Sequence, residues 1–243
     1  MTAKIEMIFL CTFMMLMACD SIIETTEDAQ TAALSKDPKV LLENSKEKQR
    51  IGAYDEAIEI LNMAVKIDPK FVPAYNQMGL ILFEADKKDE SVEAFKNAIA
   101  IDPENLNSRL GLGKTYSMIT RNDLAVEQYL KAADLKKNDP EILFKIALEY
   151  WYHQNLEKSK EYYNKVLEID SSHIQTHLNL ISVYESLEEW KKAIREIEVA
   201  RQLGKEKNDS SVVSIAERKK KFILGRMNLT EEEYQRKSQP PFD

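Results

Sequence analysis

The chain has 243 residues, of which 44% are hydrophobic and 31% charged, with a formal net charge of −7 at pH 7. This moderately acidic balance argues against a nucleic-acid partner, because phosphate binding requires clustered lysine and arginine. The two cysteines, Cys11 and Cys19, both lie near the N-terminus, so the rest of the chain has no disulfide framework and no cysteine chemistry.

The first predicted element is an apolar run, Met7–Met17, which follows Lys4. The run has the length of a signal-peptide core and is too short to span a bilayer comfortably. It ends in Leu16-Met17-Ala18-Cys19, which resembles the lipobox of bacterial lipoproteins. This resemblance implies that residues 1–18 are a cleaved lipoprotein signal peptide and that the Cys19 thiol carries a diacylglycerol. The alternative is an uncleaved signal anchor in which Cys19 is a small buried hydrophobe.

Residues 19–37 comprise Cys19 and a polar, acidic stretch, which we interpret as a tether. A flexible chain of this length has a root-mean-square reach of about 25 Å, enough to hold a folded domain just off a membrane. Asp20 follows Cys19 directly, and in enterobacterial lipoproteins an aspartate there resembles a signal for retention at the inner membrane. That rule is not general among bacteria, so the choice between inner and outer membrane stays open.

A spacing of 34 residues recurs five times in the next segment, which gives repeats at 38–71, 72–105, 106–139, 140–173 and 174–207. One position of the repeat is always small and another, four residues later, is always large and apolar. The small position holds Ala57, Ser91, Ala125, Ser159 and Ala193, and the large position holds Leu61, Phe95, Tyr129, Tyr163 and Ile197.

Each repeat shows two helical patterns, as in Leu143, Ile146, Ala147 and Tyr150, where apolar residues recur three and four positions apart. The polar segments between the two patterns are so short that the chain can only reverse, so each repeat is predicted to be a helical hairpin. One hairpin cannot bury its apolar face alone, and adjacent hairpins are therefore expected to stack. Gly79, Gly113 and Ala147 on first helices are expected to face Ser91, Ala125 and Ser159 on second helices.

The second repeat resembles the tetratricopeptide pattern: Tyr75-Asn-Gln-Met-Gly79-Leu-Ile-Leu82 is followed by Ser91, Phe95, Ala98 and Pro103. The resemblance implies an all-α fold, a right-handed α-solenoid of five tandem tetratricopeptide helical hairpins plus a C-terminal capping helix. The first repeat departs from the pattern, since Asn44, Ser45 and Lys48 replace apolar, small or aromatic residues.

Residues 208–243 are interpreted as a capping helix and a tail. The helix is predicted at about Asp209–Leu224, with Ser210 or Ser211 as its N-cap and most of Arg218–Lys221 in solvent. Its inward-facing residues are predicted to be Val212, Ile215, Ala216 and either Phe222 or Ile223. Thr230 and Glu233 form a T-x-x-E capping box, which predicts one more short helix.

In tetratricopeptide solenoids, function normally resides on the concave face, which is built by the first helices. The resemblance also places on that face an unusually apolar strip that we predict to bind a protein or peptide. The other residues placed there are Leu42, Lys46, Asn76, Leu80, Lys114, Lys145, Asn179 and Ser182. The predicted binding residues are Phe83, Leu110, Met118, Phe144, Leu148, Trp151, Tyr152 and Leu178. Two alternatives are that these side chains pack on one another or that the chain's own tail covers them.

Other specialised sites are not predicted. The carboxylate clamp of co-chaperone tetratricopeptide domains requires a defined set of Lys and Asn side chains, which no register of these repeats supplies. His173 and His177 form H-x-x-x-H, but His177 takes the place of a packing aromatic and no third ligand is evident, so no metal is predicted. A nucleophile motif, a glycine-rich phosphate loop and an H-E-x-x-H motif are also missing, so neither a cofactor nor an enzymatic activity is predicted.

The sequence therefore predicts a non-catalytic, lipid-anchored interaction module acting as a scaffold or assembly factor in a bacterial cell envelope, facing the periplasm or the exterior. It resembles in architecture the tetratricopeptide lipoproteins that assist pilus secretins or outer-membrane assembly. The alternative is a chaperone-like or regulatory subunit of an envelope enzyme, such as a peptidoglycan-processing enzyme. A third hypothesis is self-association through the first or last repeat.

Overall fold

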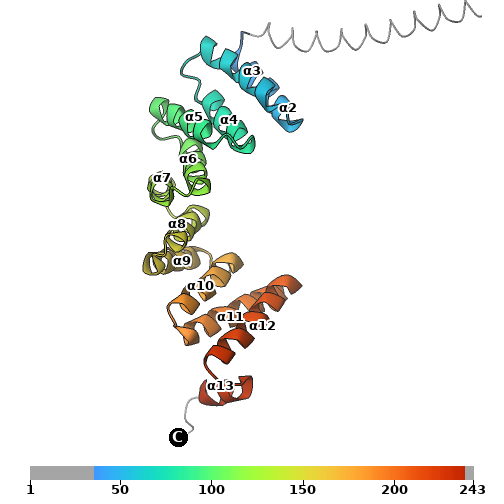
Figure 1. The fold of residues 1–243 in the computed structure, drawn as a ribbon, viewed down its shortest axis with the longest axis vertical. Helices are drawn as coiled ribbons and strands as arrows, with labels where there is room; N and C mark the ends of the chain where they lie inside the picture. Colours follow the sequence, from blue (N-terminus) through green and yellow to red (C-terminus); the bar gives the residue numbers. More distant parts are fainter. Residues whose placement is uncertain (1–35, 239–243) are drawn as a thin grey trace, which may run out of the picture. The chain divides into compact units, whose positions relative to one another are not determined.

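The structure, a computed structural model, describes residues 36–238 (Figure 1). This part of the chain forms twelve helices and no strand. Ten of the helices form five hairpins: α2 (Pro38–Arg50) with α3 (Tyr54–Ile67), α4 (Val72–Glu84) with α5 (Lys88–Ile101), α6 (Leu106–Met118) with α7 (Asn122–Leu135), α8 (Pro140–Tyr152) with α9 (Leu156–Ile169), and α10 (Ile174–Ser186) with α11 (Trp190–Glu206). The chain then forms α12 (Ser210–Arg226) and α13 (Glu231–Ser238). Five tandem helical hairpins are thus confirmed.

The N-terminal predictions fall on residues that the structure does not describe. The apolar run, the lipobox and Cys19 all precede residue 36, and so does nearly all of the predicted tether. Among the helices within 36–238, none has the length and apolar character needed to cross a membrane.

The described residues divide into two compact units, which the sequence did not predict. The first unit extends to Gly111 and the second begins at Leu112, so the division falls within α6. Each unit has its own apolar core. The largest fully buried side chains of the first unit are Leu41, Leu61, Ile81 and Phe95, and those of the second include Ile146, Tyr163, Leu180, Ile181, Ile197 and Ile223.

The predicted close approach of the two helices at small residues is present inside the hairpins. A Cβ atom added at Gly79 would lie 2.7 Å from the ring of Phe95, and one added at Gly113 would lie 2.7 Å from the ring of Tyr129. In the fourth hairpin Ser159 donates its hydroxyl hydrogen to the carbonyl oxygen of Ala147 at 2.9 Å. The helices therefore approach closely where the sequence carries small residues.

The turns of the five hairpins also repeat with the 34-residue spacing. One residue in each turn has a left-handed backbone conformation. These residues are Gly52, Asp86, Thr120, Gln154 and Glu188, with φ of 79°, 62°, 58°, 57° and 57°, respectively. Only the first of these is a glycine, the residue that adopts positive φ without steric cost. The other four turns therefore hold a side chain in a disfavoured backbone conformation.

The C-terminal helices confirm some predictions and correct others. The Thr230–Glu233 capping box is confirmed, because the Thr230 amide donates to Glu233 Oε2 at 2.8 Å and the Glu233 amide donates to Thr230 Oγ1 at 3.2 Å. The prediction of Ser210 or Ser211 as the cap of α12 was wrong. Asp209 caps this helix by accepting from the amides of Ser211 and Val212, since its carboxylate oxygen reaches both donors.

The exposure of the α12 side chains tests two further predictions. Ile223 is fully buried and Phe222 is 59% exposed, so Ile223 is the inward-facing residue of that pair. The prediction that most of Arg218–Lys221 lies in solvent was wrong for Lys220, which is buried. Its ammonium group lies 2.6 Å from Glu198 Oε1 and 2.5 Å from Glu231 Oε1, and this pairing is what permits a lysine to leave water.

Candidate protein-binding groove

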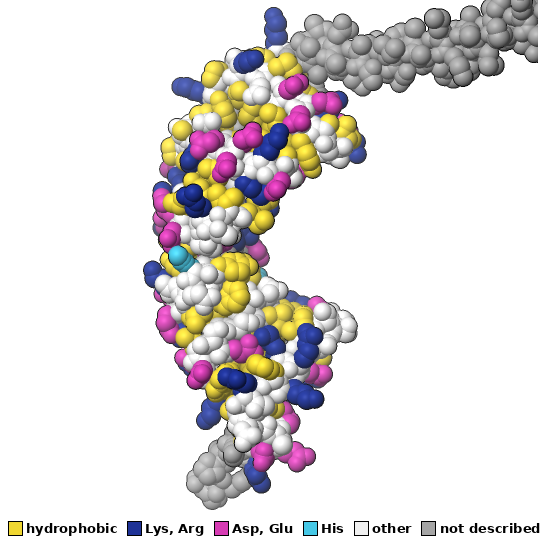
Figure 2. Space-filling view, in the orientation of Figure 1, with side chains coloured by type: hydrophobic (Ala, Val, Ile, Leu, Met, Phe, Trp, Pro, Cys, Tyr) yellow, Lys and Arg dark blue, Asp and Glu magenta, His cyan; other side chains and the backbone are white. Residues whose placement is uncertain are grey.

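A cavity of about 340 Å³ lies between α8 and α10 in the second unit. Its residues define what we call the α8–α10 groove: Phe144, Leu148, Trp151 and Tyr152 on α8, and Gln175, Asn179 and Ser182 on α10. Residues three or four positions apart share one face of a helix, so each helix contributes a continuous wall. Figure 2 shows hydrophobic side chains gathered over α8.

The α8 wall is aromatic, and at Phe144 it is held by two tilted ring contacts. The Phe144 ring lies 5.6 Å from the ring of Tyr163 and 5.2 Å from the ring of His173, centre to centre. At the other end, Trp151 and Tyr152 meet edge to face with their ring centres 5.3 Å apart. Tyr152 is 53% exposed, so an aromatic face remains open to solvent beside the cavity.

The α10 wall is polar, and a chain of hydrogen bonds orients its amides. Asn179 donates from Nδ2 to the hydroxyl of Tyr163 at 3.0 Å, and it accepts at Oδ1 from Gln175 Nε2 at 3.1 Å. A primary amide has two donor hydrogens and an oxygen that accepts two bonds, so both side chains retain capacity for a ligand. The groove therefore combines apolar contact on one side with hydrogen-bonding groups on the other.

One end of the groove is linked to α12. Lys219 Nζ lies 2.9 Å from Glu185 Oε2 and donates a longer bond of 3.4 Å to Ser182 Oγ. The Lys219 side chain is 29% exposed, and the Glu185 carboxylate beside it balances its positive charge. This end of the groove is thus polar without carrying a net charge.

The structure places only some of the predicted binding residues in the α8–α10 groove. Phe144, Leu148, Trp151 and Tyr152 line the α8–α10 groove, as does Ser182 of the predicted concave face. Leu178 is half-buried, packs against the core of the second unit and is not among the residues that line the cavity. Gln175 was not predicted to belong to the binding surface. Its position four residues before Asn179, on the same helix face, could have indicated that it does.

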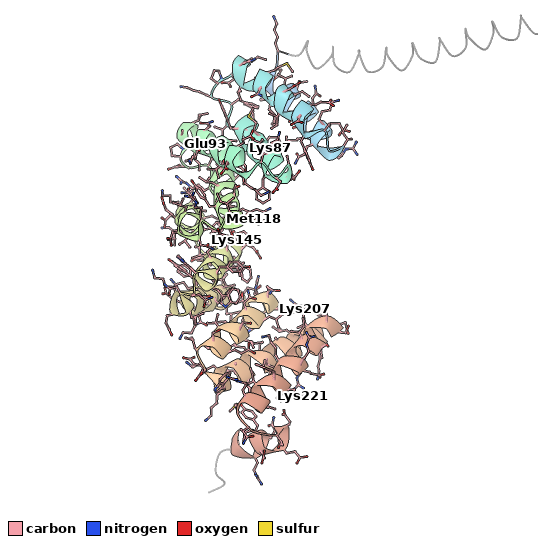
Figure 3. All side chains as sticks on the ribbon, viewed as in Figure 1. Lys87, Glu93, Met118, Lys145, Lys207 and Lys221 are labelled. Carbon is pink, nitrogen blue, oxygen red and sulfur yellow. The ribbon has the colours of Figure 1, made fainter. Side chains whose placement is uncertain are left out.

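The remaining three predicted residues lie elsewhere. Met118, on α6 in the second unit, is 59% exposed (Figure 3). Phe83 and Leu110 are half-buried residues of the first unit, and the ammonium group of Lys88 lies 4.7 Å from the centre of the Phe83 ring. A continuous strip that joins these residues to the α8–α10 groove stays a prediction.

The two histidines of the H-x-x-x-H pattern serve the packing of α10. His173 caps the helix by accepting from the Thr176 amide at 3.2 Å. His177 is buried, with Nδ1 2.6 Å from Glu196 Oε2 and Nε2 3.0 Å from the Ser171 carbonyl oxygen. Burial opposes the charged imidazolium, but these two acceptors outweigh it and raise the pKa of His177 above its ordinary value. The two rings therefore have separate partners.

Comparisons with known proteins agree on the kind of fold. The sequence profile of the tetratricopeptide repeat matches residues 72–105 and 140–173. Anaphase-promoting complex subunit 3 of Schizosaccharomyces pombe is 24% identical over 172 residues, which are 71% of this chain and 26% of that protein. The chain thus spans about a quarter of the length of this relative.

Three solved structures have the same fold at low sequence identity. MamA of Desulfovibrio magneticus gives a TM-score of 0.64 at 20% identity and covers 70% of this chain and 96% of its own. YrrB, described as a tetratricopeptide protein with an unusual peptide-binding site, gives 0.63 at 19% identity, covering 76% and 94%. The pilF protein of Pseudomonas aeruginosa gives 0.56 at 17% identity, covering 82% and 95%. The chain therefore contains tetratricopeptide repeats, and its fold is that of a tetratricopeptide-like helical solenoid.

Proposed function

We propose that this protein is a non-catalytic interaction module that binds a segment of a partner protein in the α8–α10 groove. The observation that carries the proposal is the pairing of an aromatic wall on α8 with an amide wall on α10 across one cavity. Tetratricopeptide repeats are generally non-catalytic interaction modules, which supports the same class of function.

The two walls suit an extended peptide. Main-chain N–H and C=O groups of a bound segment can pair with the amides of Gln175 and Asn179, while its apolar side chains contact Trp151 and Tyr152. The tilted ring contacts of Phe144 with Tyr163 and His173 hold part of the apolar wall in place before binding. Such preorganisation lowers the conformational entropy that is lost when the ligand binds.

We further propose that the protein is anchored to a bacterial membrane through lipid on Cys19 and faces the periplasm or the cell exterior. The support is the lipobox-like Leu16-Met17-Ala18-Cys19 after an apolar run of signal-peptide length. In this account residues 1–18 are removed, residues 19–37 tether the domain, residues 38–207 are the five repeats and residues 208–243 are the cap and tail. The module then acts as a scaffold or assembly factor in the cell envelope.

Site-specific cross-linking tests the groove. A photoreactive phenylalanine derivative replaces Tyr152 in the full-length protein in its native membrane, and a second variant carries it at Ile169, which is 44% exposed and outside the groove. We expect one dominant partner captured at position 152 and little at position 169. Equal capture at both positions, or capture only of this chain's own tail, would contradict binding in the groove.

Labelling with a radioactive fatty acid tests the anchor. The chain offers a matched control, because Cys11 is the other cysteine and lies inside the predicted signal peptide. Cys19→Ser is expected to abolish incorporation of label and Cys11→Ser to leave it unchanged. Incorporation that survives Cys19→Ser would contradict lipid attachment at Cys19.

The partner captured by cross-linking separates the two proposed roles. If that partner is an enzyme whose rate changes on binding, the regulatory-subunit alternative is favoured over the scaffold.

A further inference from the structure

A second groove lies in the first unit, on the side of the second helices of the hairpins. It occupies about 510 Å³ between α3 and α5, and we call it the α3–α5 groove. Met78 and Leu82 of α4 form its apolar floor, with Ile58 and Val65 on the α3 wall. The α5 wall carries three exposed carboxylates, Asp89, Glu90 and Glu93. Figure 3 labels Glu93 on α5, and Figure 2 shows carboxylates beside hydrophobic side chains over these hairpins.

The repeat framework does not require acidic residues at these three positions. In the fifth repeat, 102 residues further on, the equivalent positions hold Lys191, Lys192 and Arg195. Acidic residues in the first turn favour helix α5, which accounts in part for Asp89 and Glu90, but Glu93 lies beyond that turn. Asp89 and Glu90 have no ion-pair partner within 4 Å among residues 36–238, whereas Glu93 pairs with Lys96 at 2.8 Å on the same helix. The first repeat also has carboxylates at all three positions, Asp55, Glu56 and Glu59, so the α3–α5 groove is distinguished by an acidic wall that borders an apolar floor.

The same chain exposes a complementary surface on α12. Its residues Ser214, Glu217, Arg218, Lys221 and Phe222 are exposed and share one face of the helix, and we call them the α12 outer strip, which carries two cations and one carboxylate. Phe222 is 59% exposed, an unusual state for a large aromatic side chain. Within the part of the chain that the structure describes, Arg218 and Lys221 have no ion-pair partner. Figure 3 labels Lys221 on this helix.

We propose that the α12 outer strip of one copy docks in the α3–α5 groove of a second copy. Arg218 and Lys221 are three residues apart, as are Glu90 and Glu93, so two cations on one helix can meet two carboxylates on the other. Phe222, one turn from Arg218, enters the groove toward Met78 and Leu82. Like-charge repulsion between two grooves or between two strips disfavours a symmetric contact.

This contact joins different surfaces of the two copies, so a dimer either forms it twice in a reciprocal exchange or leaves one groove and one strip available for further copies. Further copies can add in the same way. The contact uses no residue of the α8–α10 groove, so an assembled protein keeps that groove for its partner. The inference goes beyond the proposed function, and either can fail without the other.

A charge exchange tests the docking. The mass of the full-length protein in detergent is measured by light scattering over a wide range of concentration. We expect the wild-type mass to rise with concentration. Glu90→Lys/Glu93→Lys and Arg218→Glu/Lys221→Glu should each weaken association at least tenfold, because each places like charges across the contact. An equimolar mixture of the two variants should associate again, since the exchanged charges are then complementary.

A matched control separates the groove from total charge. Glu127→Lys/Glu161→Lys changes the net charge equally at positions that correspond to Glu93 in the third and fourth repeats. This variant should associate as the wild type does. Circular dichroism verifies that each variant folds. A wild-type mass that stays monomeric at every concentration, a mixture that fails to associate, or a control that loses association equally would overturn the proposal.

Discussion

Ser91 on α5 donates its hydroxyl hydrogen to the carbonyl oxygen of Gly79 on α4, and the two oxygens are 2.8 Å apart in a buried contact. The bond forms where the first helix carries a small residue, which lets the two backbones approach. It shows how one pair of small residues fixes the distance between the two helices of a hairpin. The same bond joins Ser159 to Ala147 in the second unit, 68 residues further on.

Gly79→Ala tests this close approach. The added Cβ atom would lie 2.7 Å from the Phe95 ring, so the ring or the helix must shift, and we expect a loss of about 1–3 kcal/mol in the free energy of unfolding. Gly225→Ala is the matched control, because nothing lies within 4 Å of its added Cβ atom and alanine favours a helix by about 0.5–1 kcal/mol. Denaturant unfolding of both variants measures the difference. Equal stability of the two would show that the helices do not meet at Gly79.

Thr120→Gly tests the strain in the third hairpin turn. Thr120 is β-branched and has φ of 58°, whereas the equivalent residue of the first turn is Gly52. Glycine removes the steric cost but raises the entropy of the unfolded chain, so we expect a net gain of about 0.5–1 kcal/mol. The reciprocal change, Gly52→Thr, should destabilise. Thermal unfolding gives both values, and a lower midpoint for Thr120→Gly would contradict the strain.

The pair formed by His177 and Glu196 predicts a pH dependence of stability. Burial lowers the pKa of His177, but the hydrogen bonds to Glu196 and to the Ser171 carbonyl outweigh it, so the folded-state pKa is above the unfolded value of about 6.5. A raised pKa contributes stability that is fully present below about pH 6.5 and is lost as the pH rises through the folded-state pKa.

Glu196→Gln isolates that contribution. The stability difference between wild type and this variant should be larger at pH 6 than at pH 9. Glu206→Gln, an exposed change on the same helix, should show no such trend. Urea unfolding at the two pH values measures both differences, and a constant difference for Glu196→Gln would mean that His177 is neutral in the folded protein.

Lys220→Met tests the buried ion pairs beneath α13. Lys220 bridges Glu198 and Glu231, and its removal leaves Glu231 without its ion pair and Glu198 with Arg201 alone. We expect a loss of about 1–2 kcal/mol, reduced from the value for a fully buried pair because the two carboxylates are partly exposed. Lys221→Met, at an exposed neighbouring position, should change stability by less than about 0.5 kcal/mol. Identical chemical unfolding curves for both variants would contradict the bridging role.

The hairpins could be predicted because the sequence carries a strong repeating pattern. The recurrence of small and large residues at fixed positions reflects close packing, and Gly79 with Phe95 is one instance in the structure. The Thr230–Glu233 capping box was also predictable, since both partners are close in sequence and the bond pattern is local. Periodic residue patterns and bonds between residues close in sequence are thus the features that the sequence predicts directly.

Other features depend on contacts that no local pattern reveals. Lys220 belongs to a run of cations, and only its position opposite Glu198 and Glu231 makes its burial favourable. Asp209, Ser210 and Ser211 can all cap a helix, so the choice among them rests on where the backbone first turns. The packing of Leu178 against the core depends on a rotation of α10 that the sequence does not specify.

The dissociation constant of the captured partner for a Trp151→Ala variant tests the central claim most directly. Trp151 lines the α8–α10 groove, and Ile169→Ala, outside it, is the control. With helicity unchanged by circular dichroism, we predict binding at least tenfold weaker for Trp151→Ala, a loss of about 1.4 kcal/mol or more, and wild-type binding for Ile169→Ala. Equal dissociation constants for the wild type and Trp151→Ala would contradict the assignment of this groove as the binding surface.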